Sequence, residues 1–245
     1  MGLGDSPGGG PILDRAAGSA YHGRFRTPSA TKPSRPMPDD PELALAQLLA
    51  TRLCHDLAGP LGAVGAGVEL LAEEGGAPDA ATLSLIVDSQ RAMSARLRFL
   101  RAALGWTASG APLTGPAGRD LLAALLAHQV PAVELAWGID PTAPSGGLRL
   151  ALNVALVGLD TLPGCRALAL AGDAQGRLEV SLGGGAGAPR DSLLEVLRGL
   201  APGDGPRTAH AAYTRRLALV DGWTLTASPT AAGAPGLVLA LTRPG

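Results

Sequence analysis

Apolar residues recur every three or four positions in two consecutive segments of this chain, between residues 49 and 104. The first segment carries Leu49, Leu53, Leu57, Pro60, Val64, Val68 and Leu71. The second carries Leu83, Ile86, Met93, Leu97, Leu100 and Leu104 at near-heptad spacing. This period places the apolar residues of each segment along one face of an α-helix. The pattern therefore predicts two amphipathic helices joined by a short loop, which is a helical hairpin.

Acidic residues, proline and glycine mark the ends of both predicted helices. Asp40 can cap the free amides of the first helix, Pro41 suits its first turn, and Glu42 suits the positive end of its dipole. Gly75-Gly76 stops the first helix, and Pro78-Asp79 begins the second. The limits of the hairpin are thus predicted independently of its apolar pattern.

A single hairpin cannot cover both of its apolar faces, so something must pack against it. Two hairpins from two copies of the chain would cover them as a four-helix bundle, and the near-heptad spacing suits such packing. We therefore expect a homodimer formed through residues 42–106. The alternative is that the hairpin packs against the C-terminal part of its own chain. Aromatic residues make up 3% of the chain and hydrophobic residues 46%, so the core must be built from Leu, Val and Ala.

The pattern changes after the hairpin, where shorter segments with helix and strand periods follow one another. We expect a disordered leader at 1–38, the hairpin at 39–106, a Gly/Pro-rich linker at 107–118 and a C-terminal domain at 119–245. In that domain the sequence predicts helices at 119–128, 147–162, 191–200 and 208–221, and strands at 132–139, 166–171, 178–182, 223–228 and 236–242. Adjacent strands and helices without strict alternation indicate an α+β two-layer sandwich.

His55 lies on the first predicted helix, away from its apolar face. At 100° per residue the apolar residues fall within roughly 60° of Leu53, whereas His55 falls at about 200° and should face water. The residues nearest to it on that face are small: Ala58, Gly59, Gly62 and Ala66. Small residues leave room for another protein to approach the imidazole. Glycine costs about 0.5–1 kcal/mol in a helix relative to alanine, and a docking surface would compensate for that cost.

Three neighbours of His55 suit covalent chemistry at a histidine. Pro60 lacks an amide hydrogen, and its ring bends the helix just beyond His55. Asp56 can bias the imidazole tautomer, and Arg52, one turn earlier on nearly the same face, could hold a phosphoryl group. A neutral imidazole is nucleophilic near pH 7 because its unperturbed pKa is about 6.5. An exposed helical histidine is usually only a surface residue, but the proline, the small face and the expected bundle together favour phosphohistidine chemistry.

The segment Arg52-Leu-Cys-His-Asp-Leu57, followed by Pro60 and Gly67-Val-Glu-Leu-Leu71, resembles the ChpT-type histidine phosphotransferases of alphaproteobacteria. The similarity continues through the Arg-rich second helix and returns in Pro206–Leu217. It implies a dimeric four-helix bundle followed by a degenerate α/β sandwich shaped like the ATP-binding domain of histidine kinases. It also implies a reaction in which a phosphoryl group moves from an aspartate of one receiver domain to His55, and then to an aspartate of another.

The resemblance implies partners as well. These would be the receiver domain of a hybrid histidine kinase and downstream response regulators, with magnesium supplied by the receiver and no cofactor or metal held by this chain. The net charge of −1 gives no general attraction to nucleic acid or to an anionic membrane. Cys54 and Cys165 are far apart in sequence, which suits a reducing cytoplasm. We therefore expect a cytoplasmic protein.

An ATP-dependent histidine kinase is the competing interpretation. Its ATP-binding domain would need an Asn-bearing helix, a D-x-G-x-G turn for the adenine and a glycine-rich lid for the phosphates. The predicted helix at 147–162 keeps Asn153, but Val157 stands where a magnesium-binding Asn is expected. The run Gly183–Gly187 carries no aspartate for the adenine, so a simple loop is favoured. A third possibility is a non-catalytic dimeric adaptor for receiver domains, which would tolerate replacement of His55 by alanine.

Overall fold

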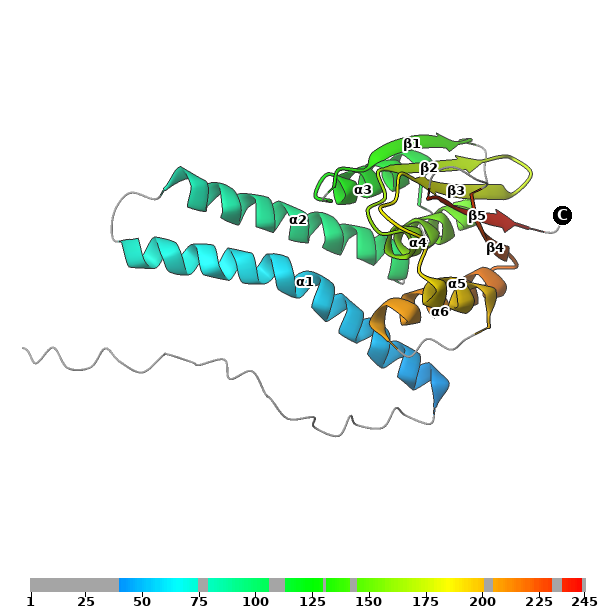
Figure 1. Ribbon diagram of the computed structural model, residues 1–245, viewed down its shortest axis with the longest axis horizontal. Coiled ribbons are helices and arrows are strands. Elements are labelled where there is room, and N and C mark those ends of the chain that lie inside the picture. Colours follow the sequence, from blue (N-terminus) through cyan, green and yellow to red (C-terminus); the bar gives the residue numbers. More distant parts are fainter. Residues whose placement is uncertain are drawn as a thin grey trace, which may run out of the picture. The chain divides into compact units, whose positions relative to one another are not determined.

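Two long helices and a compact α/β domain make up the described chain (Figure 1). The computed structural model describes residues 40–74, 79–105, 113–129, 131–141, 145–200, 205–230 and 235–243. Helices α1 (Pro41–Glu74) and α2 (Ala80–Leu104) run side by side as the predicted hairpin. The predicted leader and the Gly75-Gly76 stop lie outside the described residues. Within the described ranges, no helix combines the length and the apolar character that crossing a membrane requires.

Both hairpin helices begin where the sequence predicts. The Oδ1 atom of Asp40 accepts hydrogen bonds from the backbone N–H groups of Glu42 at 2.8 Å and Leu43 at 3.3 Å. Asp79 is the N-cap of α2, and its Oδ2 accepts from the N–H of Thr82 at 3.3 Å. The two carboxylates thereby satisfy amides that have no partner within the helix.

The C-terminal part forms a five-stranded sheet with helices packed on it, which confirms the α+β prediction. The strand order is β1-β2-β3-β5-β4; β1 and β2 are parallel, and the other neighbouring pairs are antiparallel. The strands are β1 (Glu134–Ile139), β2 (Ala167–Gly172), β3 (Arg177–Gly183), β4 (Thr224–Pro229) and β5 (Leu237–Thr242). The helices are α3 (Gly115–Leu126), α4 (Ser145–Thr161), α5 (Asp191–Arg198) and α6 (Pro206–Val220).

One face of the sheet carries the core. Buried side chains alternate with more exposed ones along the central strands, and the buried set includes Leu178, Val180, Leu182, Leu237, Leu239 and Leu241. Helix α4 lies close to this face at Gly158, where a Cβ atom would be 2.7 Å from Cδ1 of Leu182. The domain is therefore a two-layer sandwich of sheet and helices.

The base of the hairpin packs against the α/β domain of the same chain. Phe99 and Ala103 of α2 are fully buried in one core with Leu122 of α3 and Leu152 of α4. The chain from Pro38 onward forms one compact unit. The sequence left open the alternative that the hairpin packs on its own chain. This alternative therefore holds for the base of the hairpin.

The predicted linker at 107–118 is wrong at its C-terminal end, because α3 already begins at Gly115. The hydroxyl of Thr114 accepts a hydrogen bond from the N–H of Ala117 at 3.4 Å, and Pro116 occupies the first turn. The composition of this stretch favours a linker, but the same residue types also start helices. Residues 106–112 lie outside the described part.

Candidate functional site

His55 projects from the outer side of α1, as the sequence predicts, and 77% of its side chain is exposed. Its Nδ1 atom lies 3.6 Å from Oδ1 of Asp56. This distance is too long for a hydrogen bond, but it is short enough for the carboxylate to attract a positive charge on the ring. The carboxylate of Asp56 therefore lies on the Nδ1 side of the imidazole.

Pro60 lies inside α1, half-buried, five residues after His55. It cannot donate to the carbonyl of residue 56, and its ring crowds that carbonyl. Figure 1 shows that α1 changes direction in its middle, which agrees with the predicted bend. The proline therefore sets the course of the helix beyond the histidine.

The small residues next to His55 form an open surface. Ala58, Gly59, Gly62 and Ala66 are all exposed. A Cβ atom added at Gly59 or Gly62 would meet nothing within 4 Å. Packing within this chain therefore does not require glycine at either position, and their use as a docking surface for a partner stays a prediction.

A charged cluster joins three helices beneath His55. Oδ2 of Asp56 accepts hydrogen bonds from Nε of Arg52 on α1 at 2.8 Å and from Nη2 of Arg96 on α2 at 2.6 Å. Nη2 of Arg52 also forms an ion pair with Oδ2 of Asp160 on α4 at 2.6 Å. The cluster of Arg52, Asp56, Arg96 and Asp160 thus ties both hairpin helices to the α/β domain.

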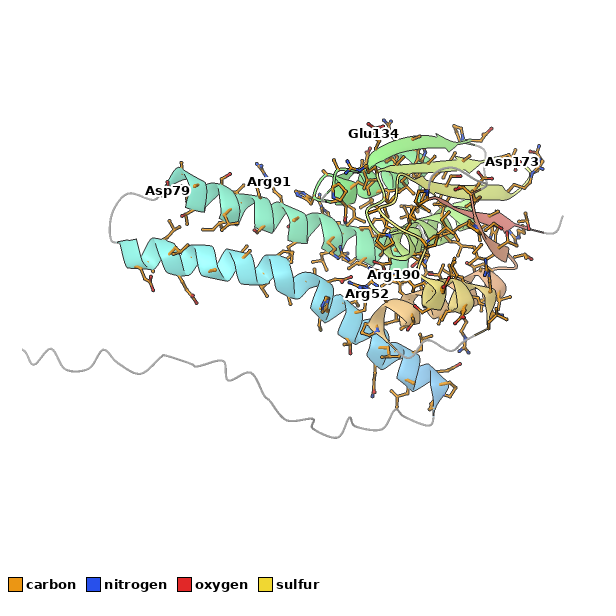
Figure 2. All side chains as sticks on the ribbon, in the orientation of Figure 1. Arg52, Asp79, Arg91, Glu134, Asp173 and Arg190 are labelled. Carbon is orange, nitrogen blue, oxygen red and sulfur yellow. The ribbon has the colours of Figure 1, made fainter. Side chains whose placement is uncertain are left out.

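Arg52 lies deeper than its position on the helix suggested. Only 3% of its side chain is exposed, so it does not share the solvent-facing side with His55. Figure 2 shows it on α1 at the level of α6. Its predicted role in holding a phosphoryl group stays a prediction, and its two carboxylate partners point to a positioning role.

The cluster keeps Asp56 ionised. Burial alone would raise the pKa of this carboxyl, but the hydrogen bond and charge of Arg96 and those of Arg52 outweigh burial and lower the pKa. Burial likewise opposes the charge on Arg52, yet Asp160 and Asp56 raise the pKa of its guanidinium. Asp56 and Arg52 are therefore both charged at neutral pH.

Asn153 and His210 form a second buried pair. The Nδ2 atom of Asn153 donates to the carbonyls of Ala103 at 2.7 Å and Arg149 at 2.9 Å. Its Oδ1 atom therefore faces Nε2 of His210 at 2.9 Å, which makes Nε2 the donor. Asn153 thus satisfies a carbonyl at the C-terminal end of α2, where helical carbonyls lack partners. Nδ1 of His210 has no hydrogen-bond partner among the described residues.

His210 gives the fold a predictable pH dependence. Burial, with the charge of Arg52 adding to it, lowers the pKa of His210 to about 3. The unfolded chain takes up this proton below about pH 6.5, whereas the folded chain stays neutral. Stability is therefore lost as the pH falls through the window from about 6.5 to about 3. Between pH 7 and pH 5 we expect a loss of about 2 kcal/mol in the free energy of unfolding.

Urea unfolding at the two pH values checks this expectation. In His210→Gln the difference between pH 7 and pH 5 should shrink, whatever the stability of the variant at pH 7. His128→Ala, which removes an exposed histidine, should leave the difference unchanged. An equal pH difference in all three proteins would contradict the assignment to His210.

The glycine run after β3 is a packed loop. The backbone N–H of Gly185 donates to the carbonyl of Pro235 at 3.3 Å, and that of Ala186 to the carbonyl of Pro163 at 2.8 Å. A Cβ atom at Gly185 would lie 2.6 Å from Cδ1 of Leu162. Two amides of the run are thus already used within the fold. Across the described ranges, no group of three or more His, Cys, Asp or Glu could hold a metal ion.

A cavity of about 480 Å³ opens beside His55 where α1 meets the start of α6. Its lining comprises Arg52, His55, Asp56, Ser192, Gly205, Pro206, Arg207 and Thr208. The sequence predicts the first three of these as site residues. It does not place the other five at the site, although Pro206–Leu217 belongs to the family resemblance. Only the fold brings the start of α6 to a histidine about 150 positions earlier in the chain.

Comparisons with known proteins identify the relatives of this chain. Residues 127–233 match the family model of the histidine phosphotransferase C-terminal domain. The "Protein phosphotransferase ChpT" of Brucella abortus (strain 2308) is 34% identical over 197 residues, which cover 77% of this chain and 92% of that protein. A solved structure titled as a bacterial phosphotransferase superposes with a TM-score of 0.67 at 28% identity, covering 81% of this chain and 96% of that one.

Proposed function

Because this chain belongs to the ChpT-type histidine phosphotransferase family and is a phosphotransferase of a phosphorelay, we propose that His55 is the residue that carries the phosphoryl group. The observation that carries this proposal is the 77% exposed imidazole with Asp56 beside its Nδ1 atom. Among the other described histidines, His210 is fully buried, and His128 has no carboxylate partner of this kind.

The proposed transfer has two steps of the same form. Nε2 of His55 attacks the phosphorus of an aspartyl phosphate on a receiver domain. The bond between phosphorus and the aspartate oxygen breaks, the carboxylate leaves, and a bond between phosphorus and nitrogen forms. An aspartate of a second receiver domain then attacks the phosphohistidine and restores the neutral imidazole.

Asp56 supports both steps through the Nδ1 side of the ring. Phosphorylation at Nε2 leaves the proton on Nδ1 and gives the ring positive character, which the nearby carboxylate stabilises. Arg52 and Arg96 hold that carboxylate in place and ionised. We therefore assign Arg52 a positioning role, in which it acts on the reaction through Asp56.

We further propose that the transfer does not use ATP. In an ATP-binding domain of this shape, Asn153 would serve the nucleotide, but here its amide is used to cap α2 and to pair with His210. Val157, one turn later, is a core residue with 1% exposure. In the loop at Gly183–Gly187, two backbone N–H groups donate hydrogen bonds within the fold. These three features argue against the kinase alternative.

The test offers the purified protein two phosphoryl donors in separate reactions. One is radiolabelled ATP, and the other is a hybrid-kinase receiver domain that carries the label on its aspartate and has been freed of ATP. We expect label on this chain from the receiver alone, in a form that acid removes and alkali does not. Label from ATP in the absence of any kinase would overturn the proposal in favour of the kinase alternative.

The open surface at Gly59 and Gly62 offers a direct test of receiver docking. In Gly62→Trp the added Cβ atom would meet no atom of this chain within 4 Å, so we expect the fold to be kept. The indole would stand about two turns from His55 on the same face and hold the receiver away. We expect transfer from the receiver to slow by about 10²-fold, as for a reacting group displaced by about 1 Å or more.

The matched control for this experiment is Gly115→Trp. Gly115 also has no heavy atom within 4 Å of an added Cβ, but it lies on α3 rather than on α1. It should transfer at the rate of the unmodified protein. Equal transfer rates for both tryptophan variants would show that the small residues next to His55 do not form the docking surface for the receiver.

We also propose that the protein acts as a homodimer through the hairpin. Large apolar side chains remain exposed on the hairpin of a single chain, and they include Leu61, Val68, Leu70, Leu83, Leu85, Val87 and Leu97. A second hairpin would cover faces of this kind in a four-helix bundle. Sedimentation equilibrium should give twice the mass of one chain.

The receiver domains proposed as partners belong to a hybrid histidine kinase and to response regulators, and each would bring its own magnesium ion. The free thiols of Cys54 and Cys165 suit a reducing cytoplasm as the place of action. Removal of magnesium by a chelator should therefore stop transfer at the receiver, while the fold of this chain stays unchanged.

A further inference from the structure

The first turn of α6 forms part of the cavity wall beside His55. The helix spans Pro206–Val220, and its N-cap Gly205 offers no side-chain oxygen to the first-turn amides. The backbone N–H groups of Arg207 and Thr208 belong to that first turn, whose amides have no intrahelical acceptor. A helix start of this kind carries partial positive charge and binds phosphate-like anions.

A second observation in the same wall also points to an anion. Arg52 lines the cavity with only 3% of its side chain exposed, and its Nη1 atom is buried without a hydrogen-bond partner among the described residues. Buried nitrogen atoms of this kind are nearly always satisfied in native proteins, by protein, water or ligand. The cavity lining therefore includes a residue with an unsatisfied guanidinium nitrogen and a helix start without a side-chain cap, and hydrogen-bond donors of both kinds favour an anionic occupant.

The charges around the cavity leave its mouth positive. Arg52 and Arg96 are balanced by Asp56 and Asp160 within the charged cluster. Arg207 also lines the cavity, is exposed, and forms no hydrogen bond or ion pair with any described residue. The net excess is therefore the guanidinium of Arg207 together with the first turn of α6.

We propose that this cavity is a phosphoryl-binding site in which Arg207 and the first-turn amides of α6 hold the oxygens of the phosphoryl group carried by His55. The proposal rests on the proposed function, because it names what holds the group after transfer. Arg207 then acts on the phosphohistidine directly, and it does so from the α/β domain rather than from the hairpin. The domain that resembles an ATP-binding domain would thereby contribute to the transfer site itself.

The first experiment measures how much phosphohistidine is present at equilibrium with a labelled receiver domain. Loss of charge-assisted hydrogen bonds in Arg207→Ala should lower the ratio of phosphorylated His55 to phosphorylated receiver by about ten- to a hundredfold. Arg207→Lys, which keeps the charge but not the planar fork, should restore part of the loss. Arg216→Ala is the matched control on the same helix, since Arg216 pairs with exposed Glu42 away from the cavity. An unchanged ratio in Arg207→Ala would overturn the inference.

The second experiment does not depend on phosphotransfer. Inorganic phosphate is titrated into the unphosphorylated protein while the imidazole signals of His55 are followed by NMR. Saturable shifts that disappear in Arg207→Ala and persist in Arg216→Ala are expected. Absence of shifts in the unmodified protein would refute the site. If phosphate binds but no receiver phosphorylates His55, the binding site stands and the proposed function fails, so the two failures are distinguishable.

Discussion

Replacing His55 by alanine is expected to abolish phosphoryl transfer to this chain. The change removes the imidazole that is proposed to accept the phosphoryl group, while the 77% exposed side chain contributes little packing, so the free energy of unfolding should change by less than about 0.5 kcal/mol. The measurement is label incorporated from a phosphorylated receiver domain, with circular dichroism and urea unfolding as checks on the fold.

His128→Ala is the matched control, because His128 is also exposed and lies just after α3. It should accept label as the unmodified protein does. Undiminished transfer in His55→Ala would show that the acceptor lies elsewhere. If the unmodified protein and the His55→Ala variant both bind receiver domains but neither accepts label, the non-catalytic adaptor is favoured, because an adaptor does not need the histidine.

Replacing Asp56 by alanine should cause the largest loss of stability of any single change at the site. Arg52 and Arg96 share this carboxylate, and only 10% of the Asp56 side chain is exposed. Removing it leaves Arg96 without its charged partner and Arg52 with Asp160 alone. Breaking a buried ion pair costs about 3–5 kcal/mol, and we expect about 3 kcal/mol because Arg96 is 20% exposed.

Urea unfolding at neutral pH measures this loss, and Asp88→Ala provides the comparison. Asp88 pairs with Arg91 at 3.7 Å on the surface of α2, where both side chains are well exposed. That change should cost less than about 1 kcal/mol. Asp56→Asn keeps the shape and removes the charge, so it should fall close to Asp56→Ala. A cost for Asp56→Ala no larger than for Asp88→Ala would mean that the charged cluster does not hold the helices together.

The same substitution also separates the two roles of Asp56. If the carboxylate stabilises the phosphorylated ring, Asp56→Asn should lower transfer even at temperatures where the variant stays folded. Asp160→Ala removes the second carboxylate partner of Arg52 but leaves Asp56 paired with Arg52 and Arg96. It should therefore destabilise the fold less than Asp56→Asn does, and it should retain more of the transfer activity.

The hairpin could be predicted because its signals are local. The apolar period, Asp40 and Asp79 act within one or two helical turns, and the caps form the expected hydrogen bonds. The same locality explains the error at 107–118. Thr114 and Pro116 start a helix, but a composition rich in Gly and Pro is shared by linkers and helix starts.

The sequence by itself determined His55, the proline after it and the small residues on the same helical face, because helical geometry alone places them together. Only the tertiary structure decided that Arg52 is buried against Asp160, that Asn153 caps α2 and meets His210, and that Arg207 lines the cavity at His55. These contacts join residues far apart in the chain. A periodic pattern shows which side of a helix is apolar. It carries no information about which other element packs against that helix, or about which residues of the two elements face each other.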